Sequence, residues 1–416
     1  MQTYNRSDFE IMAPVGSYES LHAAINAGAD AVYFGVEGLN MRAGSAANFT
    51  IDDLHRIART CELSGVKSYL TVNTIVYNPE LPLMRSVIDA ARSAGISAII
   101  ASDMAAIAYA RSVGVEVHIS TQLNLSNIEA VKFYSQFADV VVLARELDMS
   151  QVGEIHRQII ADDVRGPKGE PVRIEMFCHG ALCMAVSGKC YLSLHEMNRS
   201  ANRGTCGQIC RRGYSVTDLE TGDELHVENK YIMSPKDLKT IGFIDKMAAA
   251  GVRVFKIEGR ARGPEYVDTV VRAYDEALRA VCQGTATPEL LASFDSRLSK
   301  VFNRGFWNGY YLGERLGQWS EKYGSSASRT KRYAAKSIRY FSKLGVAEFL
   351  MEAGELCTGD EIVITGPTTG AIIMTVNELR VDGLPAAKAY KGDSISIKVD
   401  RKTRPADRLY VWDRKE

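Results

Sequence analysis

Short apolar runs rich in β-branched residues recur at regular intervals along the first 260 residues of the chain. Eight of these runs are predicted to be strands: "EIMAPV" at residue 10, "AVYFGV" at 31, "VKSYLTVN" at 66, "SAIIAS" at 97, "VEVHIST" at 115, "DVVVLAR" at 139, "VRIEMFC" at 172 and "VRVFKIEG" at 252. The segments between them repeat apolar residues every three or four positions, which predicts amphipathic helices. Strands that alternate with helices pair in parallel, because each helix returns the chain to the same edge. Eight evenly spaced units predict an α/β fold with a closed (β/α)8 barrel of the TIM type, and an open doubly wound sheet is the alternative.

The regular spacing breaks once, between residues 180 and 240, after the seventh predicted strand. Beyond the barrel, "CTGDEIVITGPTTGAIIMTVNELRVDG" and "AYKGDSISIKVD" alternate apolar and polar residues between glycine turns. Such alternation predicts a small antiparallel β-barrel. We therefore expect a barrel over residues 1–320 with an insertion over about 180–240, a linker over 321–343 and a β-barrel domain over 344–416.

The composition of the chain limits the cellular compartments and the kinds of partner that we expect. The 416 residues are 46% hydrophobic, and 50 basic and 50 acidic side chains cancel, so any polyanionic partner must be met by a local patch. No run of eighteen apolar residues occurs, and the first residues lack a basic start followed by an apolar stretch. We expect a cytoplasmic protein without a membrane partner. Thiols stay reduced in that compartment, so clustered cysteines favour metal or redox chemistry over disulfides.

Polar residues close each predicted strand, where active sites of (β/α)8 barrels form. They are Asn73, Thr74, Ser102, Asp103, His118, Ser120, Gln122, Arg145, Glu146, Glu175, His179, Lys256, Glu258 and Arg260. For roughly half of them we expect nothing more than a solvated rim. In "FKIEGR", however, Lys256, Glu258 and Arg260 alternate and leave the strand on one face. Burying this ladder is costly unless it is paired or binds an anion, and we favour a ligand site over a purely structural ion pair.

Five of the eight cysteines lie between residues 178 and 210, four of them within the irregular segment. Cys183, Cys190, Cys206 and Cys210 follow the spacing C-x6-C-x15-C-x3-C. Four thiolates can hold a zinc ion or an iron-sulfur cluster. The wide gaps favour the cluster, because structural zinc sites usually use cysteine pairs two to four residues apart.

Two hydrolase interpretations lack their machinery. Cys178 and His179 are neighbours on a predicted strand and point to opposite faces, so they do not form a nucleophile-base pair. "HEMNR" at 195 has Arg199 where a zinc peptidase needs its second histidine. Neither a G-x-S-x-G turn nor a phosphate-binding G-x-x-x-x-G-K occurs.

The stretch "EMFCHGALCMAVSGKCYLS", residues 175 to 193, resembles the signature of the collagenase-like peptidases, family thirty-two of the unassigned peptidases. "APVGSYESLHAAINAGADAVYFG", "GTCGQICR" and "KIEGR" resemble the same family, so the likeness spans nearly the whole barrel. The resemblance implies an oxygen-independent hydroxylase whose four-iron, four-sulfur cluster is held by Cys183, Cys190, Cys206 and Cys210. The C-x3-C pair and the β-domain are most similar to the branch that hydroxylates wobble uridine in tRNA with prephenate. A ribosomal RNA cytidine hydroxylase, a ubiquinone-type hydroxylase and a collagenase-like peptidase stay as alternatives.

On this interpretation tRNA is the partner, together with a second protein of the family or an electron donor. Seven basic and no acidic residues between Lys322 and Lys343, interleaved with aromatic residues, favour contact with RNA, and a solvated linker is the alternative. Arg42, Arg145 and Arg260 are candidates for the prephenate carboxylates. Asn73, Gln122 and Lys256 complete the predicted substrate-binding set. Proton transfer is assigned to His118, Glu175, His179 or Glu258.

Overall fold

The computed structural model describes residues 4–44, 48–222, 224–225 and 233–415. Within them, eight parallel strands close into a barrel, because the last strand pairs with both the first and the seventh. These strands are β1 (Glu10–Pro14), β2 (Ala31–Phe34), β3 (Lys67–Val72), β4 (Ala98–Ala101), β5 (Val117–Ile119), β6 (Val140–Val142), β7 (Arg173–Gly180) and β11 (Val252–Ile257). All eight correspond to predicted runs, and the closed barrel is confirmed over the open sheet.

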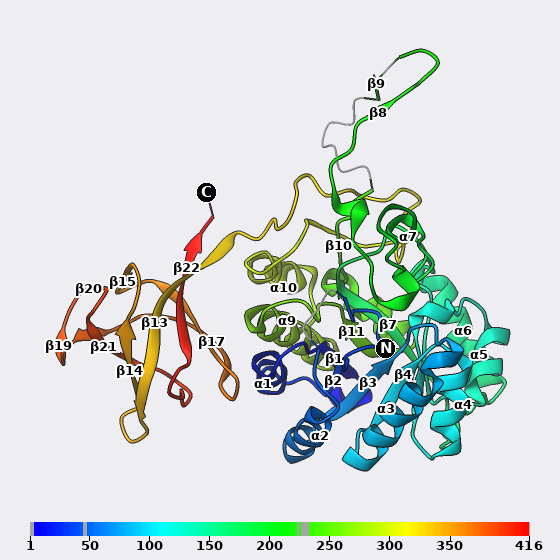
Figure 1. The fold of residues 1–416 in the computed structure, drawn as a ribbon, viewed down its shortest axis with the longest axis horizontal. Coiled ribbons are helices and arrows are strands. Elements are labelled where there is room, and N and C mark those ends of the chain that lie inside the picture. The colour runs from blue at the N-terminus through cyan, green and yellow to red at the C-terminus, as the bar shows by residue number, and fades with distance from the viewer. Residues whose placement is uncertain (1–3, 45–47, 223, 226–232, 416) are drawn as a thin grey trace.

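Helices surround the barrel as the apolar periodicity predicts (Figure 1). They are α1 (Tyr18–Ala27), α2 (Asp53–Leu63), α3 (Leu81–Ala94), α4 (Met104–Ser112), α5 (Ile128–Ser135), α6 (Met149–Ala161), α8 (Ile244–Ala249) and α9 (Pro264–Cys282), with the short α10 (Pro288–Ser293) and α11 (Asp295–Leu298) after the last strand. Capping residues determine where several of these helices begin or end. The Asp148 side chain accepts from the backbone of Ser150 and Gln151 at the start of α6, and Gly28 ends α1 in the left-handed conformation.

The interior of the barrel is filled with side chains. Met12, Tyr33, Tyr69, Ile100 and Val254 belong to an inner cluster that is separate from the larger core between strands and helices, whose members include Leu21 and Val267. A barrel of eight strands is just wide enough for its side chains to fill it. The interior is therefore a packed core, and ligands are restricted to its mouth.

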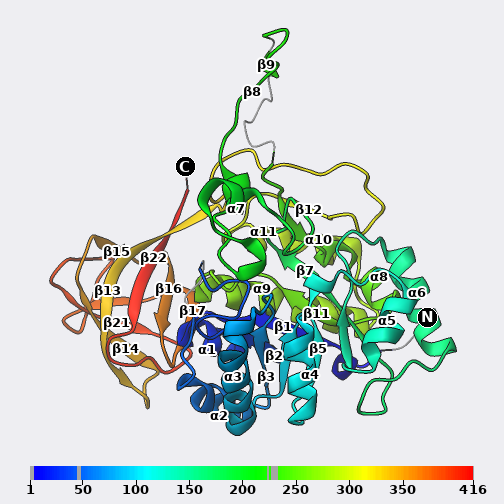
Figure 2. The ribbon, with the colours of Figure 1, turned by 45° about the vertical axis from the view of Figure 1, so that its right-hand side comes forward.

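Residues 181–239 form the insertion, which leaves the barrel after β7 and returns before α8. It contains α7 (Leu192–Met197), the short pair β8 (Val216–Thr217) and β9 (Glu224–Leu225), and β10 (Asp237–Lys239), which pairs antiparallel with the end of β7. β12 (Phe306–Trp307) extends the same sheet beside β10. Figure 2 shows α7 above the barrel strands, with β8 and β9 projecting away from the barrel.

The C-terminal part is an antiparallel sheet of eight strands in the order β17-β16-β22-β13-β14-β21-β18-β19, with a two-stranded companion, β15-β20, among the described residues. The strands are β13 (Arg329–Phe341), β14 (Val346–Met351), β15 (Glu355–Cys357), β16 (Glu361–Gly366), β17 (Gly370–Thr375), β18 (Leu379–Val381), β19 (Leu384–Pro385), β20 (Lys388–Tyr390), β21 (Ser394–Lys398) and β22 (Arg408–Arg414). The sheet has its own core and also packs on the barrel through β17 and α1.

One predicted connection forms a strand instead. Residues 329–341 of the expected basic linker form β13, which pairs with both β14 and β22 at the centre of the sheet. Its small residues Ala334 and Ala335 are buried, and its lysines and arginines are exposed or half-buried. The many charged residues obscured the alternation of apolar and polar positions that would have predicted a strand.

The helices of the described residues include none with the length and apolar character needed to span a membrane.

Candidate functional site

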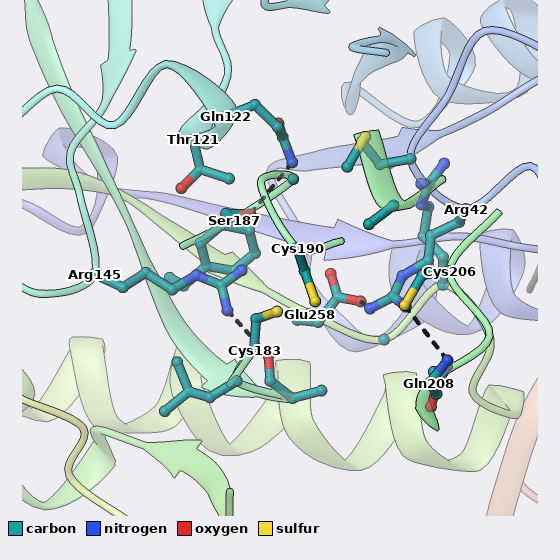
Figure 3. Close-up of a pocket in the computed structure, with 18 of the residues that line it drawn as sticks. Arg42, Thr121, Gln122, Arg145, Cys183, Ser187, Cys190, Cys206, Gln208 and Glu258 are labelled. Atoms are coloured by element: carbon teal, nitrogen blue, oxygen red, sulfur yellow. Dashed lines mark hydrogen bonds and ion pairs between the residues drawn. The ribbon is translucent and has the colours of Figure 1, made fainter. Parts of the chain in front are cut away.

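A cavity of about 220 Å³ opens at the carboxyl ends of the barrel strands, below the insertion. Its wall includes residues from the ends of several strands: Tyr33, Thr71, Asn73, Ser120, Arg145, Phe177, Lys256 and Glu258. The insertion supplies the opposite wall, including all four cysteines of the predicted cluster. Figure 3 shows Cys183, Cys190 and Cys206 near Glu258, with Arg145 and Arg42 on opposite sides of them. The mouth of the barrel is thus the site that strand polarity predicts.

The deepest charged pair joins two neighbouring strands. Lys256 Nζ on β11 lies 2.7 Å from Glu175 Oε1 on β7, and the two side chains are 6% and 0% exposed. The ammonium also lies 4.7 Å from the centre of the Tyr33 ring. Glu175 Oε2 has no hydrogen-bond partner among the described residues. Such a buried pair persists because each charge compensates the other.

Glu258 is held as a carboxylate by its surroundings. Its Oε1 lies 2.5 Å from Nη2 of Arg42, and its Oε2 accepts a hydrogen bond of 3.2 Å from the Tyr33 hydroxyl. Burial raises the pKa of Glu258, but the charges of Arg42, Arg145 and Arg260 outweigh burial and lower the pKa to about 2. Glu258 is therefore ionised at neutral pH, where it orients Arg42 and accepts hydrogen bonds.

The wall of the cavity is strongly cationic. Its described lining contains one carboxylate, Glu258, and these cations: Arg42, Arg145, Arg211, Lys256, Arg260, Arg262 and Arg304. Arg304 lies 3.4 Å from Asp237, which lies outside the lining. For four of the cations no ion pair with a described carboxylate is found: Arg145, Arg211, Arg260 and Arg262. This excess charge favours an anionic ligand.

Two of these arginines keep unused donors inside the protein. Arg145 donates to the Ala181 carbonyl oxygen at 3.0 Å and stacks on Phe177, with 3.7 Å from its guanidinium carbon to the ring centre. Arg260 is 5% exposed and donates to Asn40 Oδ1 and Thr71 Oγ1, each at 3.0 Å. The Nε atoms of both arginines are buried without a partner among the described residues. Buried donors without partners are unusual, so a ligand that accepts from them would stabilise the site.

The four cysteines lie around one region of the cavity. Burial raises the pKa of the Cys210 thiol to about 11; Arg211 lowers it, and the thiolates of Cys183, Cys206 and Cys190 each raise it further. The backbone N–H of Gln208 donates to Cys206 Sγ at 3.4 Å. All four cysteines line the same cavity, and Cys210 interacts with each of the other three.

The donor set suits a cluster better than a single ion. In the part of the chain that the structure describes, no three His, Cys, Asp or Glu side chains are arranged to hold a metal ion. A cluster separates its cysteine ligands by iron and sulfide, so it needs thiols that surround a cavity without touching one point. Four cysteines on one cavity wall, with backbone N–H and arginine donors beside them, fit a four-cysteine cluster.

Asn73 and Gln122 form a polar corner of the cavity. Asn73 Nδ2 donates to Ser120 Oγ and Gln122 Oε1, each at 3.2 Å, and Asn73 Oδ1 accepts from the backbone of Met41 at 3.2 Å. Gln122 Nε2 reaches Ser187 of the insertion at 3.4 Å. Asn73, directly after β3, and Gln122, after β5, thus also hold the insertion and the Arg42 loop against the barrel.

The structure does not bring His118 or His179 to the cavity. His118 lies one layer deeper than Ser120, 1% exposed, with its ring 4.5 Å from that of Tyr69 and its Nε2 3.3 Å from Glu116. His179 packs outside the barrel against Tyr266 and Tyr274 of α9. Burial, with a smaller contribution from Lys239, lowers the pKa of His179 to about 3.

A bulge explains the position of His179. On β7, Phe177 pairs with Lys256 and His179 pairs with Ile257, so Cys178 is an extra residue in the strand. A β-bulge interrupts the alternation of side chains, and residues after it face the other way. Strand alternation alone would have placed His179 on the same face as Glu175 and Phe177, beside Lys256.

Most of the basic residues predicted to contact RNA along 322–343 are paired in the structure. Arg329 pairs with Glu361, Lys331 with Glu265, Arg332 with Asp413 and Arg339 with Glu348. Lys322, Lys336 and Lys343 form no ion pair with a described residue. The cationic charge available to a ligand is consequently greater at the barrel mouth than on β13.

Comparison with known proteins identifies the family. The family model described as Peptidase family U32 matches residues 16–321, nearly three quarters of the chain. The chain belongs to peptidase family U32.

Curated relatives in the family carry two kinds of name. A protein of Porphyromonas gingivalis named collagenase is 68% identical over 412 residues, covering 99% of this chain and 100% of that protein. The tRNA hydroxylation protein P1 of Bacillus subtilis is 32% identical over 410 residues, covering 96% and 94%. A 23S rRNA 5-hydroxycytidine synthase of Escherichia coli is 33% identical over 322 residues, covering 76% of this chain and 47% of that protein. Relatives of this U32 protein are enzymes named for peptide or RNA chemistry.

The signature that resembles the family has a structural reason at several positions. Glu175 pairs with Lys256, and Phe177 lies under Arg145. Gly180 has φ +99°, and a Cβ there would lie 2.3 Å from the Glu258 carbonyl oxygen. Ser193 accepts from the backbone of Gly207 at 2.9 Å and lies 3.7 Å from Cys206 Sγ. These residues assemble the cavity wall of the U32 protein.

Other lining residues were missed by sequence reasoning. Tyr33, Arg211, Arg262 and Arg304 line the cavity, and Arg211 donates to the Pro235 and Leu182 carbonyls at 2.6 and 2.5 Å. Tyr33 was available from its inward position on a predicted strand. Arg262 and Arg304 lie in loops, where periodicity carries no information about direction.

Proposed function

We propose that this protein is an oxygen-independent RNA hydroxylase that forms 5-hydroxyuridine at the wobble position of tRNA, with a four-iron, four-sulfur cluster and with prephenate as co-substrate. The observation that carries the proposal is the presence of four thiols and an excess of arginine in one cavity at the barrel mouth. Thiols suit an iron-sulfur cluster, and arginines suit carboxylate and phosphate groups. A relative similar over nearly the whole chain is named a tRNA hydroxylation protein, which supports the same choice.

Cys183, Cys190, Cys206 and Cys210 would hold the cluster, which when bound supplies one-electron chemistry or Lewis acidity at the mouth. The insertion positions these ligands through its own contacts. Gly204 has φ +76°, and a Cβ there would lie 2.1 Å from the Asn40 carbonyl oxygen, so the cysteine segment packs directly on the loop that carries Arg42. The metal-binding and anion-binding parts of the site are therefore mechanically joined.

The arginines would bind prephenate through its two carboxylates. Arg145 and Arg260 offer buried Nε donors without partners among the described residues, and bidentate contact is the strong mode for a guanidinium with a carboxylate. Arg42 is already engaged with Glu258, which leaves it to orient the site or to exchange partners when an anion enters. The three arginines surround the same cavity as Lys256, so a dianion there has its charge compensated.

Replacing the C5 hydrogen of uracil by a hydroxyl group adds one oxygen atom, removes two electrons from the base and releases the C5 proton. The oxygen comes from a co-substrate or water, and the electrons pass to the co-substrate or to a redox partner protein. Glu258 is the ionised group at the mouth and is the proposed first acceptor of the proton. Glu175 is the alternative, since its partner Lys256 lines the cavity.

The proposal is tested by mass spectrometry of nucleosides from digested tRNA. Three strains are compared: a deletion strain, the same strain carrying this gene, and one carrying its Cys206→Ser form. We expect 5-hydroxyuridine derivatives to be absent without the gene, to return with the intact gene, and not to return with Cys206→Ser. Unchanged tRNA in all three strains would contradict the proposal, and a change in ribosomal RNA cytidine instead would favour the alternative named by the Escherichia coli relative.

A peptidase is the second candidate, because the relative that is 68% identical is named collagenase. The geometry gives this candidate little support. No histidine is found among the described residues of the cavity wall, and Cys178 is fully buried with its neighbour His179 turned outward. Cleavage of gelatin that survives both iron chelation and Cys206→Ser would establish the peptidase and exclude a cluster-dependent origin of that activity.

A further inference from the structure

A second cavity of about 120 Å³ lies beside the first, on the other side of the segment that carries Cys183. The two cavities share Arg145, Leu182, Cys183, Met184 and Ser187 among their lining residues. The rest of the second wall differs in character, since it contains Trp307, Tyr310, Trp319 and Pro235, together with the polar side chains of Asn124 and Glu146. We call this the aromatic cavity.

The aromatic wall is held in place by backbone pairing. Trp319 bridges Pro235 in antiparallel register, and the flanking bonds run from Lys236 N to Gln318 O at 2.9 Å and from Ser320 N to Ser234 O at 2.7 Å. Trp307 is 5% exposed and donates from Nε1 to the Lys236 carbonyl at 3.1 Å. The ring of Trp307 and the backbone that carries Trp319 are thus held in place, which lowers the conformational entropy lost when a ligand binds.

Polar groups occupy the border between the two cavities. Arg145, whose Nε is buried without a described partner, lines both, and so do Thr121 and Ser187. The ring of Tyr310 meets Trp307 edge to face, with 5.2 Å between centres. Aromatic faces with a few hydrogen-bonding groups at one edge match a planar heterocycle that carries polar atoms along its rim.

We propose that the aromatic cavity binds an unstacked pyrimidine base of single-stranded RNA, with the C5 edge of the base directed across the shared border into the arginine-lined cavity, which holds Glu258 and binds the anionic co-substrate. This inference rests on the proposed RNA chemistry and gives each cavity a separate ligand on either side of Cys183. Proline rings of a collagen-like peptide also pack on aromatic side chains. RNA is favoured because Arg211 and Arg262, which are not assigned to the co-substrate, line the adjoining cavity without a described carboxylate partner, which suits phosphates and not a nearly neutral peptide.

The test compares two RNA hairpins with the sequence of an anticodon arm, one with uridine at the wobble position and one with an abasic ribose there. Affinity is measured for the wild type, Trp319→Leu and, as a matched control, Tyr323→Leu, whose ring is 71% exposed and lies outside the cavity wall. In the wild type we expect the abasic hairpin to bind about tenfold more weakly, which corresponds to about 1.4 kcal/mol and lies within the usual range for one stacked base. Trp319→Leu should bind both hairpins with the weaker affinity, and Tyr323→Leu should behave as the wild type.

Equal binding of the two hairpins by the wild type would overturn the inference, and so would a tenfold preference that persists in Trp319→Leu. Tyr310→Leu provides a second variant if Trp319→Leu does not fold. A collagen-like Gly-Pro-rich peptide that displaces the uridine hairpin from the wild type would also overturn it, by assigning the cavity to a peptide. Failure of the proposed function is seen separately, as tRNA that contains the same nucleosides with and without the gene.

Discussion

The buried pair of Lys256 and Glu175 allows a quantitative prediction. Lys256→Met removes the ammonium and leaves a carboxylate that is 0% exposed, with Oε1 deprived of its contact at 2.7 Å and Oε2 already without a described partner. Breaking a buried ion pair by removing one partner costs about 3–5 kcal/mol in the free energy of unfolding. Because methionine keeps most of the volume of the lysine stem, a cavity contributes little to this loss.

The assay is urea unfolding of the wild type and variants, followed by tryptophan fluorescence. Arg59→Met is the control, because the Arg59–Glu62 pair is 65% and 72% exposed and such pairs contribute at most about 1 kcal/mol. The double variant Lys256→Met, Glu175→Leu removes both charges and should recover most of the lost stability. The reasoning is refuted if Lys256→Met costs no more than Arg59→Met, or if the double variant is no more stable than the single one.

Three further predictions concern the titrating groups and the cluster. The pKa of Glu258 is about 2 in the folded protein, against an ordinary 4.5, so the ionised carboxylate stabilises the folded state above about pH 4.5 and this contribution is lost as the pH falls toward 2. Glu258→Gln should remove this part of the acid sensitivity, measured as the difference in the urea midpoint of unfolding across that pH range. Because His179 has a pKa of about 3 and lies outside the cavity, His179→Phe should leave the pH profile of activity unchanged above about pH 4, and a displaced profile would restore its predicted proton-transfer role. Cys190→Ser should lower iron and acid-labile sulfide per chain, whereas Cys282→Ser on α9 should not, and equal metal contents would refute the ligand assignment.

The fold was largely predictable because its signals are local. Each barrel strand is a compact apolar run followed by an amphipathic helix, so periodicity identifies the units and their number implies closure. The cavity was predictable to the same extent, since strand polarity places Asn73, Arg145, Lys256 and Glu258 at one end of the barrel. The spacing of the four cysteines also identified residues of the opposite wall of the cavity, which the insertion supplies.

What the sequence could not supply depends on pairing between distant segments. The bulge that turns His179 outward arises from the register of β7 against β11, which no local pattern encodes. The ion pairs that neutralise basic side chains of β13 involve carboxylates distant in the sequence, such as Glu265 and Asp413. The aromatic cavity likewise joins Trp319 to Pro235 across 84 positions of sequence, through a backbone bridge that periodicity does not predict.

The packing of the C-terminal sheet on the barrel determines how the protein can meet a large ligand. Val363, Ala371 and Trp412 belong to the same buried cluster as the barrel core, and Gly370 lies so close to α1 that a Cβ there would be 2.6 Å from the Ala23 nitrogen. A contact of this kind does not slide, so the sheet and the barrel mouth are held at a fixed separation. Any ligand that contacts both parts must therefore span this fixed separation.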